Sequence, residues 1–308
     1  SDGTEEPEPE SGLDASSAAS SPPRPSKPFP SDALAVPLLP PAPVLSPEGF
    51  LELCRQPPLQ GLATLPRLKP PLAVPLSLEE LPGPGALFGL DAEFVQYAPA
   101  QKATVQGALV EVRPARLGLA RVSVVRGDPD SPMHGRACID DVIRSGEPVH
   151  DYLTPWSGLR AGDLDVQTSP HALTTFRAAY LKLRFLADAG CVFVGHGLKA
   201  DFRMLNLLLP RNQVVDTADL WSRGRGRKLS LRFLASFLLK QTIQQGTHDS
   251  IEDALAALRL YELHRALRSS GEVDATIARL YDWGAAYGYG PVLWADGKPR
   301  PAGEAGTG

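Results

Sequence analysis

The sequence predicts a mixed α/β domain in which strands come first and then alternate with helices. Short apolar runs rich in strand-forming side chains begin after residue 85, and later stretches such as 171–190 and 248–269 repeat apolar residues at helical spacing. Proline is concentrated before this domain, because residues 1–85 hold 20 of the 31 prolines. Strands followed by alternating strands and helices typically form a mixed sheet with helices packed on its faces.

Residues 1–85 are expected to be a disordered, proline-rich segment. The first 30 residues are acidic, rich in serine and nearly free of large apolar side chains, so they cannot bury enough surface to offset chain entropy. Residues 31–85 keep the prolines but add many leucines. We expect them to be extended, either as a linker or as a strip that lies along a partner surface.

Residues 86–269 are expected to form the folded domain, and its elements follow from local patterns. We expect strands at 87–94, 118–125, 136–143, 191–197 and 214–220. We expect helices at 171–190, at 199–209 before Pro210, in the stretch that Ser230 opens as its N-cap, and from His248 to about Ser269. Residues 270–308 are expected to be a C-terminal extension that packs partly on the domain through scattered aromatics and then frays.

Composition excludes several classes of protein. The formal net charge of −4 argues against a passive, sequence-blind binder of nucleic acid. Three widely spaced cysteines form neither a disulfide framework nor a zinc motif, and they suit a reducing compartment. Because no apolar run has the length of a membrane span or of a signal peptide, we expect a cytoplasmic protein.

Two carboxylates share one face of the first predicted strand. Asp91 and Glu93 are separated by one residue, and residues i and i+2 of a strand point to the same side. An edge strand would let both face water, but the flanking apolar residues favour a central strand. Buried there, the pair needs compensation, which a divalent cation with oxygen ligands such as Mg²⁺ or Mn²⁺ can provide.

Two later segments place further ionisable groups at the ends of elements. Asp201 follows a strand and a GHG turn, where on its own it would be an ordinary acid of a first helical turn. Asp249 and Glu252 have the spacing of a capping pair before an apolar helix face. Capping leaves His248 and Asp253 unexplained, although a single histidine before a helix is usually a surface or capping residue.

Taken together, the three segments have the order of the DEDDh exonuclease signature: D-x-E on a strand, Asp after a strand and turn, and H-x-x-x-x-D at a helix start. The sequence over about residues 76–268 resembles the exonuclease domain of the catalytic subunit of the Pan poly(A) deadenylase complex. The block YLTPWSGLRAGDLD at 152–165 is the most family-specific part, and the GHG turn also fits. The main departure is residues 97–117, a variable insertion between the first two strands.

The resemblance implies an RNase H-like fold and a two-metal site. It implies that Asp91, Glu93, Asp201 and Asp253 hold two divalent cations, Mg²⁺ or Mn²⁺, and that His248 is the general base. The implied activity is 3′→5′ hydrolysis of mRNA poly(A) tails with release of 5′-AMP. Two alternatives stay open: a DEDDh exonuclease for other RNA or DNA 3′ ends, and a catalytically silent scaffold that binds nucleic acid, against which the intact set of five residues argues.

Candidate substrate contacts have structural explanations of equal or greater weight. Phe94 could stack on a terminal base but also suits the core, which we favour. His196 could touch substrate or bond backbone in its turn, and we slightly favour the second. The basic run that includes Arg225, Arg227 and Lys228 is either a solvated loop or a mobile arm that meets RNA phosphates, with equal support.

The resemblance also bears on partners. Pan-type catalytic subunits carry a WD40 propeller and an inactive ubiquitin-hydrolase-like domain before the nuclease, and neither fits into 85 proline-rich residues. We therefore expect a fragment, the product of a partial gene model, or a diverged form. The family's regulatory subunit docks largely on those missing parts, so we expect poly(A) RNA as the partner and no stable complex with that subunit through this chain alone.

Overall fold

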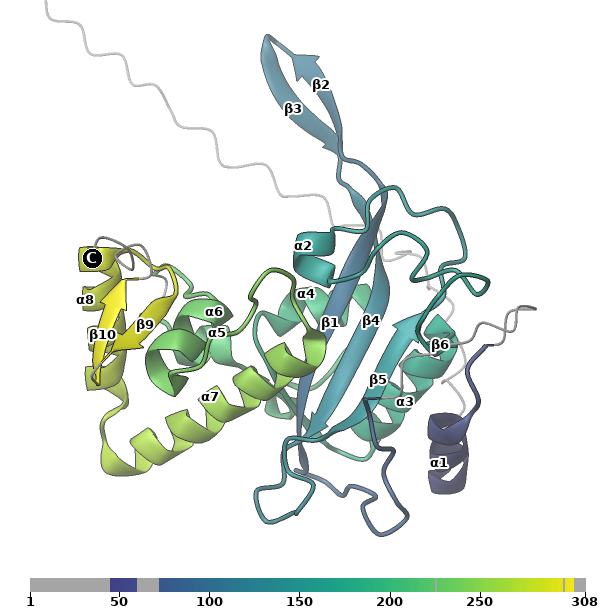
Figure 1. Cartoon of the computed structure of the whole chain (residues 1–308), viewed down its shortest axis with the longest axis horizontal. Coiled ribbons are helices and arrows are strands. Elements are labelled where there is room, and N and C mark those ends of the chain that lie inside the picture. Colours follow the sequence, from purple (N-terminus) through teal and green to yellow (C-terminus); the bar gives the residue numbers. More distant parts are fainter. Residues whose placement is uncertain (1–44, 60–71, 225, 296, 302–308) are drawn as a thin grey trace, which may run out of the picture. The chain divides into compact units, whose positions relative to one another are not determined.

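The computed structural model describes residues 45–59, 72–224, 226–295 and 297–301. They contain a six-stranded mixed sheet, which confirms the predicted fold class (Figure 1). In order across the sheet the strands are β6 (Leu173–Thr174), β5 (Ala137–Ile143), β4 (Arg116–Arg126), β1 (Leu87–Ala98), β7 (Val192–Gly195) and β8 (Val214–Asp216). β1 runs antiparallel to β4 and parallel to β7, so it is a central strand, as its apolar flanks predict.

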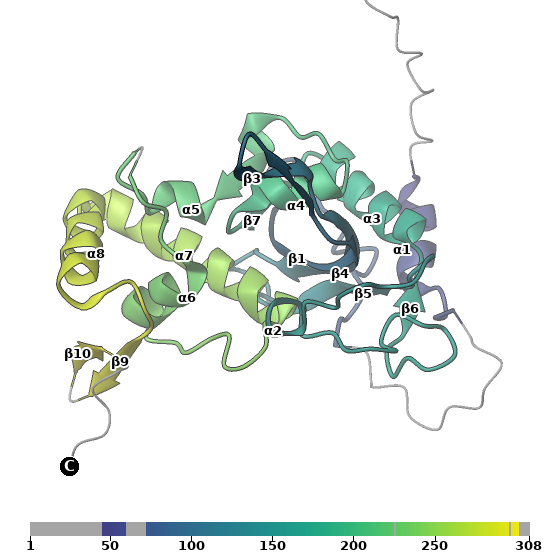
Figure 2. The ribbon, with the colours of Figure 1, turned by 90° about the horizontal axis from the view of Figure 1, so that it is seen from above.

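The two faces of the sheet are covered by different helices. Phe88 and Leu90 of β1 belong to the main core, which α3 (Phe176–Asp188) and α4 (Leu198–Met204) help to build (Figure 2). The opposite face receives α7 (Ser250–Ser270), which contacts β1, β4 and β7. The odd-numbered residues of β1 from Leu87 to Glu93, among them the two acids, therefore lie on the face toward α7.

Two of the predicted helices are shorter than expected. The helix predicted at 171–190 is α3, which begins after its N-cap Thr175, because Leu173–Thr174 pairs with β5 as strand β6. The helix predicted at 199–209 is α4, which ends at Met204 because Asn206 has a left-handed φ of 52°. Both boundaries are set by tertiary pairing or backbone conformation, which local spacing does not reveal.

The strand predicted at 214–220 is also shorter, because Asp216 ends it. Its side chain accepts a hydrogen bond from Ala218 N at 2.9 Å and so caps a short helix. Ser230 caps the next helix, as predicted, by accepting from Phe233 N. The short elements of this region are the 3₁₀ turn η1 (Arg211–Gln213), α5 (Thr217–Leu220), α6 (Leu231–Leu234) and the π-helical turn η2 (Ala235–Leu239).

The C-terminal region adds elements of its own. Helix α8 (Val273–Tyr287) follows α7, and the strands β9 (Val292–Ala295) and β10 (Lys298–Pro301) form a small antiparallel pair. Leu280 and Val292 lie with Trp221 in a second apolar cluster, which α7 also joins. That the extension frays toward its end stays a prediction, since residues 302–308 lie outside the described part.

The proline-rich segment contains a helix, which the expectation of extended chain missed. Helix α1 (Pro47–Arg55) is capped by Ser46 and buries Phe50, whose ring stacks on that of Phe185 in α3 at 4.3 Å. Phe50 and Leu51 of this segment thus pack on the domain itself. The predicted disorder of residues 1–44, and of 60–71, lies outside the described residues.

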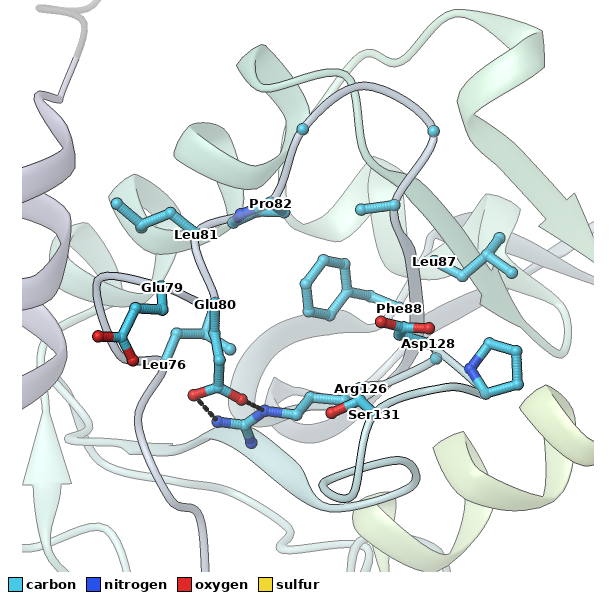
Figure 3. Close-up of a pocket in the computed structure, with 15 residues that line it drawn as sticks. Leu76, Glu79, Glu80, Leu81, Pro82, Leu87, Phe88, Arg126, Asp128 and Ser131 are labelled. Atoms are coloured by element: carbon cyan, nitrogen blue, oxygen red, sulfur yellow. Dashed lines mark hydrogen bonds and ion pairs between the residues drawn. The ribbon is translucent and has the colours of Figure 1, made fainter.

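Residues 72–86 lead into β1 beside a cavity of about 630 Å³ (Figure 3). Glu80 accepts two hydrogen bonds from Arg126 of β4, at 2.7 and 3.2 Å, and the arginine is 4% exposed. Arg126 also donates to the carbonyls of Val74 and Ala137. This partly buried ion pair fastens the entry segment to the end of β4.

The insertion at 97–117 forms a β-hairpin that extends away from the sheet (Figure 1). Its strands β2 (Gln101–Val105) and β3 (Ala108–Arg113) are joined by Gln106 and Gly107, both with positive φ. This turn suits a two-residue hairpin loop. The remaining helix of the domain, α2 (Thr154–Ser157), lies in the family-specific block. Within the described residues, no helix has both the length and the apolar character needed to cross a bilayer.

Candidate active site

The face of β1 that meets α7 carries two acidic side chains. Asp91 lies opposite Ser123 of β4, and Glu93 lies opposite Arg121. Glu93 is 6% exposed, so its carboxylate is almost fully removed from water. A buried carboxylate needs either a cation or hydrogen-bond donors to remain ionised.

Helix α7 brings a third carboxylate to this pair. Asp253, in its first turn, is 3% exposed. One oxygen from each of Asp91, Glu93 and Asp253 lies within 4.8 Å of the others. Gly89 permits this approach, because a Cβ at that position would lie 2.7 Å from the carbonyl oxygen of Ala254. Three acids from two segments about 160 residues apart in sequence thus form one cluster.

The carboxylate cluster is incompletely satisfied. Glu93 Oε1 and Asp253 Oδ1 are buried, and neither has a hydrogen-bond partner among the described residues. Buried polar atoms in native proteins almost always have partners, and an unpaired buried charge is costly. Clustered hard oxygen donors of this kind suit Mg²⁺ or Mn²⁺. The residues present therefore fit a divalent cation.

The pKa values of the three carboxyl groups reflect the same cost of burial and mutual repulsion. Burial and the charge of Glu93 raise the pKa of Asp91 well above its ordinary value. Burial and the charge of Asp253 raise the pKa of Glu93 to about 8, and burial raises that of Asp253 to about 6. Without a cation, these carboxyl groups resist simultaneous ionisation.

Asp201 lies near the cluster but outside its compact part. It occupies the first turn of α4, is 8% exposed, and has its pKa raised to about 7 by burial. Its charge contributes to the raised pKa values of Asp91 and Glu93. Its oxygens are not among the three that lie within 4.8 Å of one another.

His248 lies beside the cluster, two residues before α7. Its Nδ1 is 3.6 Å from Asp253 Oδ2, and its side chain is 28% exposed. Burial, and next the charge of Arg232, lower the pKa of His248, so the imidazole is neutral at pH 7. The loop after α2 packs closely on the backbone of His248. A Cβ at Gly158 would lie only 2.6 Å from the His248 carbonyl oxygen.

The predicted substrate contacts have structural partners in this state. His196 Nδ1 is 3.0 Å from Thr217 Oγ1, and Phe94 packs against the main core. The guanidinium of Arg227 lies 4.6 Å from the ring centre of Tyr289. The two other basic candidates are Lys228, whose Nζ pairs with Asp219, and Arg225, which lies outside the described residues. Their roles toward RNA stay predictions.

Gln244, which contacts Asp253, and Trp156, in the family-specific block, escaped the sequence analysis. Gln244 Nε2 donates to Asp253 Oδ2 at 2.7 Å, and its own backbone has a left-handed φ of 56°. No local pattern marks such a residue, because its role depends on the tertiary contact. Trp156 of α2 is 61% exposed. It could have been singled out, since an aromatic in the most family-specific block is a candidate for base stacking.

Comparison with known proteins adds independent findings. A family model described as exonuclease matches residues 88–261. The catalytic subunit pan2 of the PAN2-PAN3 deadenylation complex from Schizosaccharomyces pombe is 46% identical over 219 residues, which cover 70% of this chain and 20% of that protein. The Homo sapiens PAN2 subunit is 47% identical over 199 residues, 64% of this chain and 16% of that protein. The chain thus spans about a fifth of the length of these curated relatives.

Solved structures agree with this similarity. The pseudoubiquitin-hydrolase–RNase module of Saccharomyces cerevisiae PAN2 has a TM-score of 0.69 and 35% identity, covering 77% of this chain and 36% of that one. The corresponding Pan2 module in complex with A7 RNA has a TM-score of 0.63 and 38% identity, covering 70% and 34%. The similarity in these modules extends over most of the described domain.

Proposed function

Because the chain belongs to the exonuclease family, we propose that it is a metal-dependent 3′→5′ exoribonuclease that shortens poly(A) tails and releases 5′-AMP. The family supports phosphodiester hydrolysis from a chain end. The relatives named as deadenylation subunits support poly(A) as substrate. Since the chain spans only part of those relatives, both statements are proposals for this protein.

The cation site of this proposal consists of Asp91, Glu93, Asp201 and Asp253. Two divalent cations, Mg²⁺ or Mn²⁺, would neutralise these four carboxylates and, when bound, activate water and stabilise the charge of the leaving 3′ oxygen. Asp91 and Glu93 hold their positions through the ladder of β1 with β4. Asp253 is oriented by the amide of Gln244.

His248 is the proposed general base. A neutral imidazole beside the cluster can accept the proton of the attacking water, and the lowered pKa keeps it neutral at pH 7. Its partial exposure lets the proton pass on to solvent. The contact of its backbone with the loop at Gly158 restricts where the ring lies.

One observation carries this proposal: three buried carboxylates converge within 4.8 Å, two of their oxygens lack partners among the described residues, and a histidine adjoins them. A silent scaffold would gain nothing from such an arrangement, because it costs stability. The arrangement is useful only with a cation bound.

The test is a time course with 5′-labelled oligo(A) in Mg²⁺, with and without EDTA. We expect stepwise shortening from the 3′ end, release of 5′-AMP, and arrest by EDTA. Asp91→Asn should abolish the reaction, since it removes one ligand charge. If the protein with Mg²⁺ or Mn²⁺ releases no mononucleotide, the proposal fails.

Parallel reactions with oligo(U) and with DNA separate a deadenylase from a general exonuclease. Equal rates on all three would support the second reading. The relatives are named as subunits of a PAN2-PAN3 complex. We propose poly(A) RNA as the partner of this chain.

A further inference from the structure

We propose that Arg121 is a positioning residue that holds the start of α7, and with it His248 and Asp253, against the strand of Asp91 and Glu93. The effect of this role on turnover rests on the proposed function. The contacts that support it are nevertheless independent of any reaction. They consist of a partly buried polar network between β4, β5 and the N-terminus of α7.

Arg121 is central to this network. It lies directly opposite Glu93 in the ladder of β1 and β4, and its side chain is 11% exposed. Its Nε and Nη2 donate to the two oxygens of Asp140 at 2.7 and 3.2 Å, and its Nη1 donates to Asp249 Oδ2 at 3.1 Å. The planar fork of arginine can serve two carboxylates at once, which lysine cannot do with the same geometry.

Asp249 links this arginine to the helix. It is the N-cap of α7, and its Oδ1 accepts from the backbone N–H of Ile251 and Glu252 at 3.0 and 3.3 Å. It directly follows His248, and its carbonyl accepts from the N–H of Asp253. A shift of Asp249 would therefore displace the proposed base and a proposed ligand together.

A second connection, through Ser123 of β4, joins the sheet to the start of α7. Ser123, opposite Asp91 in the ladder, is fully buried and donates to Asp140 Oδ1 at 2.9 Å. Its hydroxyl also lies 2.6 Å from that of Ser250, the first residue of α7. Asp140 thus anchors both connections from the sheet to the helix start.

The charge of Arg121 acts on the same carboxylates. It favours ionised Asp91 and Glu93, yet it forms no hydrogen bond to either of them among the described contacts. The acids consequently keep their oxygens free for a cation. Residues that orient ligands in this way typically change metal affinity or activity by about 10- to 100-fold when mutated.

Arg126 provides a matched control in the same strand. It is also a buried arginine that is paired with a carboxylate, Glu80, but it lies at the cavity beside the entry segment (Figure 3). Arg121→Met and Arg126→Met both remove a buried charge. Arg121→Lys and Arg126→Lys keep the positive charge and lose only the planar, forked set of donors of the guanidinium.

The experiment measures Mn²⁺ affinity by calorimetry, hydrogen exchange at residues 248–256, and kcat and KM on oligo(A). We expect Arg121→Met to weaken Mn²⁺ binding and lower kcat by about 10- to 100-fold each, with KM nearly unchanged. Hydrogen exchange at residues 248–256 should rise in Arg121→Met. For Mn²⁺ affinity, kcat and exchange, Arg121→Lys should give values between those of Arg121→Met and the wild type. Arg126→Met should lower the melting temperature while retaining wild-type Mn²⁺ affinity.

Equal Mn²⁺ affinity and exchange in the Arg121 and Arg126 variants would overturn the inference. Should Arg121→Met not fold, the two lysine variants decide in the same way. Mn²⁺ binding and exchange do not require catalysis. A wild-type protein that binds Mn²⁺ but releases no nucleotide would therefore refute the proposed function, while these two measurements still decide the role of Arg121.

Discussion

His248 shows how much of the proposed chemistry depends on a single side chain. Its ring adjoins Asp253 without belonging to the three-carboxylate cluster. We predict that His248→Ala lowers kcat on oligo(A) by about 10²- to 10⁴-fold, the usual worth of a general base. Mn²⁺ affinity should stay within about threefold, because the imidazole is not a proposed ligand, and His150→Ala at an exposed position is the control. A loss of Mn²⁺ binding in His248→Ala would make the histidine a ligand instead.

His196 allows a prediction for pH. Burial lowers its pKa, an effect that the charge of Asp216 only partly offsets. The native state then binds this proton less readily than the unfolded chain does, so the stability contributed by neutral His196 is full above the unfolded pKa of about 6.5 and is lost as pH falls below it. His196→Gln should flatten the rise of melting temperature between pH 5.5 and 7.5, measured by calorimetry. The same slope in wild type and variant would contradict this.

The residues of the site differ in how far the sequence reveals them. Asp91 and Glu93 are marked by their alternation in an apolar strand, and His248 with Asp253 by a spacing that capping does not explain. Gln244 and Arg121 carry no such mark. Their partners are nine and 128 residues away, and only the tertiary structure pairs them.

Among the elements, the contact between β1 and α7 governs the geometry of the site. Gly89→Ala would put a methyl group 2.6 Å from Val125 Cγ2 and 2.7 Å from the backbone oxygen of Ala254. We predict a loss of about 1–3 kcal/mol in the free energy of unfolding, as for other overpacked sites, because α7 must move away. Denaturant titration and Mn²⁺ affinity measure the two effects.

Gly146→Ala is the control for this prediction, since a Cβ there meets no atom within 4 Å and its φ is not positive. It should leave stability nearly unchanged. Wild-type stability and Mn²⁺ affinity in Gly89→Ala would show that the helix and strand can separate without cost, against the close approach described above.

Element types followed from the sequence more reliably than their limits did. The apolar runs gave the long strands of the sheet, and the capping pair gave the start of α7 within two residues. Strand β6 is only two residues long and exists because β5 lies beside it. Helix α1 was missed because the prolines around it suggested extended chain, whereas Pro47 stands at the first helical position, where proline is favoured.

For the whole molecule, folding and cation binding should be coupled. Folding forces Asp91, Glu93 and Asp253 together, and their raised pKa values show that the metal-free site opposes its own ionisation. A cation that binds only the folded state stabilises it, by about 2.7 kcal/mol when present at 100 times its Kd. Removing the cation removes this stabilisation and leaves the repulsion among the three carboxylates.

We therefore predict that EDTA lowers the melting temperature and loosens the first turns of α7. Hydrogen exchange should increase at residues 250–256, whereas α3, which packs on the opposite face of the sheet, serves as the internal reference and should change little. Readdition of Mg²⁺ or Mn²⁺ should restore protection, and Ca²⁺ at equal ionic strength tests for specificity. Unchanged exchange in α7 on chelation would mean that the helix is held by its apolar face and the Arg121 network alone, and that the acids tolerate each other without a cation.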